Sequence, residues 1–297
     1  MDDAMRLKRP ASRRPRLSDA ETEARMLEAG AAFVTAQGLS LSLEHLSMEE
    51  LIHAAGVSRT SSYRRWPTKD LFTADLLLRL AEAAELSGGI PGLEEAVAQL
   101  PDAAFAHVDT PQGRRTALVE TLRVLVQTDF VAMLDSSDWR TYVSLRAAHV
   151  GLPDGALRAR VAEALGVTER RFTRVRAAAF ETLAVSTGHR LPPADPRGWS
   201  GLALAVGAVT TGLLIRGWSD PADLMTPVET RAYGSDVVSS WPTATLVTAG
   251  VYLDAVETDP DVVWDEARIA ALRASAGDLA GAVSSAAEGL RHREGLD

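Results

Sequence analysis

The strongest constraint on this chain is a set of helix start and stop signals packed into the segment around residues 47–69. Ser47 and Glu50 have the spacing of a capping box, in which a hydroxyl accepts a backbone N–H of the first helical turn. Gly56 supplies a left-handed residue that ends a helix without a steric penalty, and Ser58 can cap the next helix. These signals predict two short helices joined by a turn of three residues.

The second helix of the pair is expected to stop early. Pro67 disfavours helical φ and ψ at Trp66, so the helix should last about two turns. Thr68 can then cap a third helix, which runs from Lys69 towards Glu85. The short middle helix is therefore expected to lie between two longer helices.

Apolar side chains in this segment are expected to form a small core. Trp66 and Leu71 flank the Pro67 break. We expect both to be buried and to close the bundle against Phe33 and Leu51.

The short middle helix carries many side chains that can donate hydrogen bonds to nucleic acid. Arginine forks match guanine edges and phosphates, and hydroxyls suit either target. Taken singly, a tyrosine is more often a packing residue, and an arginine pair is more often a solvated face. Together with the two caps, the turn glycine and the proline, these residues favour a helix-turn-helix that binds DNA; they are Arg59, Thr60, Ser61, Ser62, Tyr63, Arg64 and Arg65.

The stretch AGVSRTSSYRRWPTKDLF resembles the signature of the TetR family of bacterial transcriptional regulators, and the resemblance extends from Ser18 to roughly Leu80. It implies an all-α fold in which an N-terminal three-helix helix-turn-helix domain precedes a larger helical ligand-binding and dimerisation domain. It also implies phosphate contacts from Tyr63 and Lys69, and base contacts near Thr60, Ser61 and Arg64. The full set of candidate DNA-contacting residues is Ser47, Arg59, Thr60, Ser61, Tyr63, Arg64, Arg65 and Lys69.

Residues 1–17 are expected to form a flexible basic arm. The first eighteen residues hold six basic side chains, two prolines and no apolar periodicity. Such a segment is either a disordered solubilising tail or an arm that follows a groove or the phosphates of DNA. Residues 1–80 contain 12 Lys and Arg against 11 Asp and Glu, whereas the remaining residues contain 19 against 29. The acidic charge therefore lies outside the candidate DNA-binding segment, which favours the second interpretation.

The rest of the chain reads as helices separated by glycine- and proline-bearing breaks, without the short alternating runs typical of strands. We expect a DNA-binding domain at 18–86, a joint in SGGIPG at 87–92, a ligand-binding and dimerisation domain at 93–257 and additional C-terminal helices at 258–297. Helices are predicted at 93–107, 113–134, 137–149, 154–165, 168–187, 199–217, 236–257 and 264–291.

The most apolar stretch of the chain lies at 199–218 and has a tryptophan at each end. Its uncharged run is near the lower length limit for a membrane span, and it is rich in glycine and threonine. A buried helix is the better interpretation. The family resemblance implies a homodimer, which we expect to form through helices near 199–217 and 236–257; a helix buried within one subunit is the alternative.

A small-molecule effector is implied by the same resemblance. Aromatic and polar residues on otherwise apolar central helices are the candidates to line its cavity, although each is individually more often a packing residue. They are Phe105, His107, Arg123, Gln127, Phe130, Met133, Trp139, Tyr142 and His149.

Other classes of function find no support in the sequence. The chain has no cysteine, its six histidines lack metal-ligand spacing, and it contains no nucleophile elbow or phosphate-binding glycine loop. We therefore expect no catalysis, no metal and no cofactor, and the lack of cysteine and of an apolar leader favours the cytoplasm. We therefore expect this protein to be a cytoplasmic, ligand-responsive repressor that binds a palindromic operator as a homodimer. An architectural or ligand-independent DNA-binding protein is the alternative.

Overall fold

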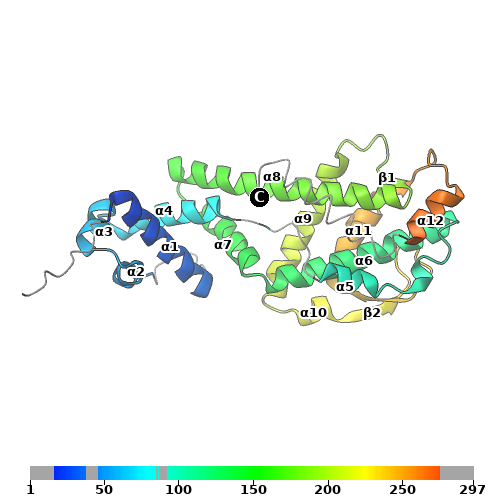
Figure 1. The fold of residues 1–297 in the computed structure, drawn as a ribbon, viewed down its shortest axis with the longest axis horizontal. Coiled ribbons are helices and arrows are strands. Elements are labelled where there is room, and N and C mark those ends of the chain that lie inside the picture. Colours follow the sequence, from blue (N-terminus) through cyan, green and yellow to red (C-terminus); the bar gives the residue numbers. More distant parts are fainter. Residues whose placement is uncertain (1–16, 38–45, 85, 87–91, 275–297) are drawn as a thin grey trace, which may run out of the picture.

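The computed structural model describes residues 17–37, 46–84, 86 and 92–274. Within these residues the fold is mostly helical, as predicted, with twelve α-helices and four short strands. The molecule is elongated, with α1–α4 at one end and the longer helices of the body, residues 92–274, extending from it (Figure 1). Residues 1–16 of the predicted basic arm, residues 87–91 of the predicted joint at 87–92 and the chain beyond 274 lie outside the described residues.

Local capping signals set the first four helices, which are α1 (Asp19–Gln37), α2 (Met48–Ala55), α3 (Arg59–Arg65) and α4 (Lys69–Glu82). Ser18 and Glu21 form a reciprocal capping box at α1. Ser47 accepts the Glu50 N–H, and Gly56 has a φ of 63° at the end of α2, both as predicted. Thr68 occupies the N-cap position of α4, but its side chain makes no capping hydrogen bond, so that prediction was wrong.

The body is built from helices of very different length. The longest, α8, runs as a single helix through residues that were predicted to form two, because nothing near Gly166 breaks it. Pro101 follows a short α5, so the helix predicted at 93–107 is instead a short helix and a 3-10 turn. The body elements are α5 (Leu93–Ala98), η1 (Asp102–Ala104), α6 (Pro111–Asp135), α7 (Ser137–Gly151), α8 (Ala156–Ser186), α9 (Gly198–Gly217), α10 (Ala222–Met225), α11 (Thr243–Leu253) and α12 (Glu266–Ala274).

Two small antiparallel sheets correct the expectation of a chain without strands. In one, β2 (Pro227–Thr230) pairs with β3 (Ser239–Pro242); in the other, β1 (His189–Arg190) pairs with β4 (Glu257–Thr258). Strand β3 occupies the start of the helix predicted at 236–257, so α11 begins only at Thr243. Strands of two to four residues are too short to show alternation in the sequence.

Buried side chains link the α1–α4 unit to the body. One hydrophobic cluster contains Met26 and Phe72 from the first four helices together with Trp139 of α7 and Leu165 of α8. Helix α4 packs along α8 and α7. These buried side chains form one continuous packed cluster between α4 and the body.

The core of the α1–α4 unit is centred on Trp66, which is fully buried as predicted. Its ring packs edge-on against Phe72 at 5.1 Å between centroids, and its indole N–H donates to Asp75 at 2.9 Å. The prediction for Leu71 was wrong, because that side chain is 52% exposed. Phe72 and Leu76, one turn apart, occupy the side of α4 that contacts Gly30 of α1, and Leu71 lies off this face.

These two residues give a matched test of the core. Trp66→Ala should lower the free energy of unfolding by about 3–5 kcal/mol, because it removes a buried ring and leaves a cavity. Leu71→Ala should change it by less than about 0.5 kcal/mol, since the side chain is largely in solvent. Urea denaturation followed by circular dichroism measures both, and equal losses would contradict this assignment of the core.

Candidate functional site

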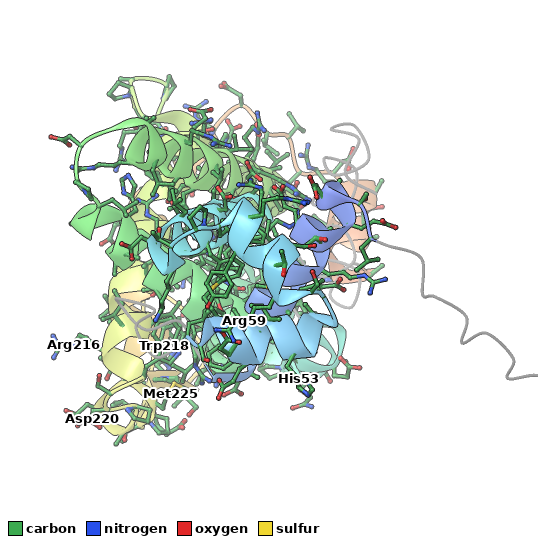
Figure 2. All side chains as sticks on the ribbon, turned by 90° about the vertical axis from the view of Figure 1, so that its left-hand side faces the viewer. His53, Arg59, Arg216, Trp218, Asp220 and Met225 are labelled. Atoms are coloured by element: carbon green, nitrogen blue, oxygen red, sulfur yellow. The ribbon has the colours of Figure 1, made fainter. Side chains whose placement is uncertain are left out.

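Helix α3 presents one face to the core and the other to solvent. Ser62 and Trp66 are fully buried and anchor the inner face. Ser58 fixes the start of the helix by accepting the Ser61 N–H at 3.0 Å, and its hydroxyl donates to the Ser61 hydroxyl at 2.8 Å. The view onto this end of the molecule shows Arg59 near the centre and His53 beside it (Figure 2). A short exposed helix is thus held rigidly at one tip of the molecule.

Every arginine of α3 contacts a carboxylate from a neighbouring helix. Arg59 pairs with Glu49 of α2 at 2.9 Å, and Arg64 pairs with Asp19 of α1. Tyr63 donates its hydroxyl to the same Glu49 at 3.0 Å. The outer face of α3 is therefore a mixed surface of cations and carboxylates.

Arg65 is held more firmly than the other two arginines of α3. It donates two hydrogen bonds to Glu23 of α1, at 2.9 and 3.2 Å, and a third to Asp75 of α4 at 3.0 Å. Its guanidinium also lies over the Trp66 ring, 5.1 Å from the centroid. The hydrogen bond to Glu23, the largest cause, raises the pKa of Arg65 above its ordinary value. Arg65 therefore joins α1, α3 and α4.

The remaining candidate DNA-contacting residues lie around this surface. Thr60 is exposed on α3, and Ser61 is partly buried beneath the Ser58 cap. Lys69 is partly exposed in the first turn of α4. The hydroxyl of Ser47 is engaged with the backbone of α2 at 3.4 Å. All eight candidates lie on α2, α3, α4 or their caps, within one end of the molecule.

The nine candidate ligand-lining residues are not gathered in one place. Phe105 belongs to the hydrophobic cluster of the body, whereas Phe130, Met133, Trp139 and Tyr142 belong to the cluster shared with α1–α4. His107 is exposed, and His149 is partly exposed. Arg123 and Gln127 line a cavity of about 490 Å³ beside α5 and α6, and the other seven candidates are not among the residues that line it.

Tyr142 and Trp139 are engaged in packing between α7 and α8. The Tyr142 hydroxyl donates to Glu169, which also pairs with Arg146 at 3.2 Å. Burial and this carboxylate raise the pKa of Tyr142 above its ordinary value. Trp139 meets Phe172 edge-on at 5.2 Å. These contacts give both aromatic residues a role in holding α7 against α8.

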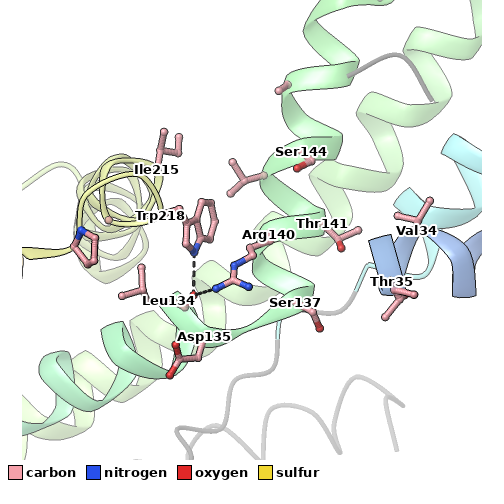
Figure 3. Close-up of a pocket in the computed structure, with 15 residues that line it drawn as sticks. Val34, Thr35, Leu134, Asp135, Ser137, Arg140, Thr141, Ser144, Ile215 and Trp218 are labelled. Atoms are coloured by element: carbon pink, nitrogen blue, oxygen red, sulfur yellow. Dashed lines mark hydrogen bonds between the residues drawn. The ribbon is translucent and has the colours of Figure 1, made fainter. Parts of the chain in front are cut away.

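A larger cavity, of about 910 Å³ and open to solvent, lies between the α1–α4 unit and the body. Its walls come from the last turn of α1, the end of α6, residues 137–147 of α7 and the end of α9 (Figure 3). None of the nine predicted ligand residues lines it. Its lining comes from three segments that lie far apart in the chain, at 34–36, 134–147 and 215–221, and they share no motif that could have identified the cavity from the sequence.

Helices α9 and α11 pack against each other and leave apolar side chains in solvent. On α9, Leu204 and Ile215 are 53% and 50% exposed, and Val247 of α11 is 45% exposed. By length and apolarity α9 is also the one helix among the described residues that could cross a membrane, a test that core helices of soluble proteins pass as well. Leu204 and Ile215, three turns apart, lie on the same face of α9.

Comparisons with models of protein families, with curated proteins and with solved structures find no match to this chain. The family resemblance therefore depends on the residues around α2 and α3 alone. In the described part of the chain, no group of three or more His, Asp or Glu residues could hold a metal ion.

The different settings of Arg65 and Arg64 predict different effects on stability. Arg65→Gln should lower the free energy of unfolding by about 1 kcal/mol, because it removes charged hydrogen bonds to two helices at a partly exposed site. Arg64→Gln should cost less than about 0.5 kcal/mol, since it removes one surface pair. Urea midpoints at low salt measure both changes. A larger loss for Arg64→Gln would overturn the structural role given to Arg65.

Proposed function

We propose that this protein is a ligand-responsive transcriptional regulator, a repressor that binds a palindromic operator as a homodimer. The observation that carries the proposal is the α2–turn–α3 unit at one tip of the molecule, with Arg59, Thr60 and Arg64 exposed on its short second helix. An α-helix fits the major groove of DNA, where arginine forks can distinguish guanine from other bases.

The carboxylate partners of α3 are compatible with DNA binding. Arg59 and Arg64 each make one exposed ion pair, and pairs of this kind contribute only about 0–1 kcal/mol. Phosphates and guanine edges can replace such carboxylates at little cost. Arg65, with its three hydrogen bonds, would stay in place and orient α3.

The homodimer would form through the exposed faces of α9 and α11. Ala208 and Gly212 continue the exposed face of α9 between Leu204 and Ile215, so small residues permit close approach of a second helix. A helix of twenty residues is about 30 Å long, enough to contribute to an interface of ordinary size. Two copies of α3 would then be presented to two half-sites of one operator.

The proposed DNA contacts predict two different mutant phenotypes. With an operator selected from random duplexes, Arg64→Ala should lose discrimination between the operator and its single-base variants, because a base contact is removed. Lys69→Ala should weaken binding to all duplexes and reduce the slope of log affinity against log salt by about one unit, because a phosphate contact is removed. Fluorescence anisotropy across a salt series measures both.

These measurements test the residue assignments separately from the proposed function. If both variants keep wild-type affinity and salt dependence while the wild type binds specifically, the residue assignments are wrong. If the wild type selects no sequence at all, the regulator proposal fails and a ligand-independent architectural protein takes its place.

The proposed interface predicts that one substitution separates the subunits. Leu204→Glu should convert the dimer to a monomer, because it places a charge in the centre of the apolar face. Val150→Glu, on α7, is the matched control, since Val150 is 74% exposed outside that face and should leave the dimer intact. Sedimentation velocity gives the masses. A wild-type monomer that binds lipid vesicles would contradict the dimer and favour a membrane contact for α9.

A further inference from the structure

The cavity of about 910 Å³ lies where the α1–α4 unit meets the body, and its size is that of a site for a small organic molecule. Val34 and Thr35 in the last turn of α1 form one wall, and Ile215 and Trp218 at the end of α9 form the opposite side (Figure 3). Helix α7 provides the floor between them. The lining combines aliphatic side chains, one indole ring and hydroxyl groups.

Arg140 and Trp218 give this cavity a defined polar point. Arg140 donates to the carbonyl of Leu134 at 2.9 Å, and the indole N–H of Trp218 donates to the same carbonyl at 2.9 Å. This shared acceptor holds the guanidinium beside the indole ring, as the close-up shows (Figure 3). Asp135 also lines the cavity, but its carboxylate points away from Arg140 in that view.

Arg140 retains hydrogen-bonding capacity for a ligand. Among the described residues no carboxylate pairs with it, in contrast to the arginines of α3. A guanidinium has five N–H donors, and the Leu134 carbonyl engages one nitrogen. The planar fork that remains suits a carboxylate, which accepts two parallel hydrogen bonds.

We propose that this cavity binds a small aromatic carboxylic acid, with its carboxylate on Arg140 and its ring between Trp218 and Ile215 on one side and Thr35 on the other. The aliphatic and indole surfaces would bury the ring. The hydroxyls of Thr141 and Ser144 lie on α7, which forms the floor of the cavity, and would form hydrogen bonds with polar substituents of the ligand.

Occupancy of this site would act on α3 through α1, a consequence that rests on the proposed function. Helix α1 packs on α2, α3 and α4, and its last turn is part of the cavity wall. A ligand that contacts α1 and α9 together would favour one separation of the α1–α4 unit from the body. Because differential binding shifts a two-state equilibrium, DNA affinity would change by about 5- to 150-fold.

The test uses 2-naphthoic acid as the probe and its methyl ester as the uncharged counterpart. Protein labelled with 15N-tryptophan gives indole N–H signals, of which Trp218→Phe identifies one. The acid should shift the Trp218 signal in a saturable way and bind at least tenfold more tightly than the ester. Arg140→Gln should remove that preference, because the charged hydrogen bonds are lost.

Two tryptophan substitutions of the same size separate this cavity from the other one. Ser144→Trp fills the proposed site and should weaken binding of the acid at least tenfold, whereas Thr128→Trp fills the cavity of about 490 Å³ and should leave binding unchanged. Circular dichroism checks that each variant is folded. Unchanged binding to Ser144→Trp, or equal affinity of wild type for acid and ester, would overturn the site.

The regulatory consequence has its own readout. Saturating acid should shift the operator affinity of the wild type at least fivefold and leave that of Ser144→Trp unchanged. Binding of the acid at Trp218 without any change in operator affinity would overturn the coupling alone. The indole titration is made without DNA, so it tests the ligand site independently of DNA binding. Absence of specific DNA binding would therefore overturn the proposed function and leave the ligand site unaffected.

Discussion

The hydrogen bonds that converge on Asp75 are the interaction on which the candidate site depends. Asp75 accepts from the Trp66 indole at 2.9 Å and from Arg65 at 3.0 Å, and Arg65 also binds Glu23. These contacts tie the end of α3 to α4 and α1, although α3 has only seven residues and cannot be stable alone. Arg59 and Arg64 each make one exposed ion pair and can exchange partners while Arg65 holds the helix in place. The same α4 packs on α7 and α8, which extends this support into the body.

The arginines of α3 are balanced by carboxylates on the neighbouring helices. Asp19, Glu23 and Glu49 lie against the arginines of α3, so the unit does not present a simple basic patch. Long-range attraction of this unit to DNA would therefore be weaker than its number of arginines suggests, and it would fall further as salt screens the charges. Under the proposed function, such pairing would lower non-specific affinity and leave selectivity to the base contacts.

Local signals in the sequence predicted local structure well, and long-range contacts less well. The caps at Ser47 and Ser58 and the left-handed Gly56 follow from steric and hydrogen-bonding rules that involve neighbouring residues only, and the structure confirms them. The exposure of Leu71 depends on how α4 is turned against α1, which no local rule contains. Strands β2 and β3 have four residues each, too few for a pattern of alternating apolar and polar residues to predict a strand from the sequence. The cavity beside Arg140 and Trp218 is assembled from helices far apart in the chain, so the predicted ligand residues lie elsewhere.

Under the proposed function, this chain is a dimer that reads DNA in a sequence-specific way with α3. The most direct measurement is hydroxyl-radical footprinting of the purified protein on DNA flanking its own gene, with competitor duplex present. A dimeric regulator should give two protected half-sites related by a two-fold axis and separated by about one helical turn, 10–10.5 base pairs. The contradicting result is weak protection that spreads along the duplex and disappears when competitor is added. It would have to be seen both at the DNA flanking the gene and at sequences selected from random duplexes.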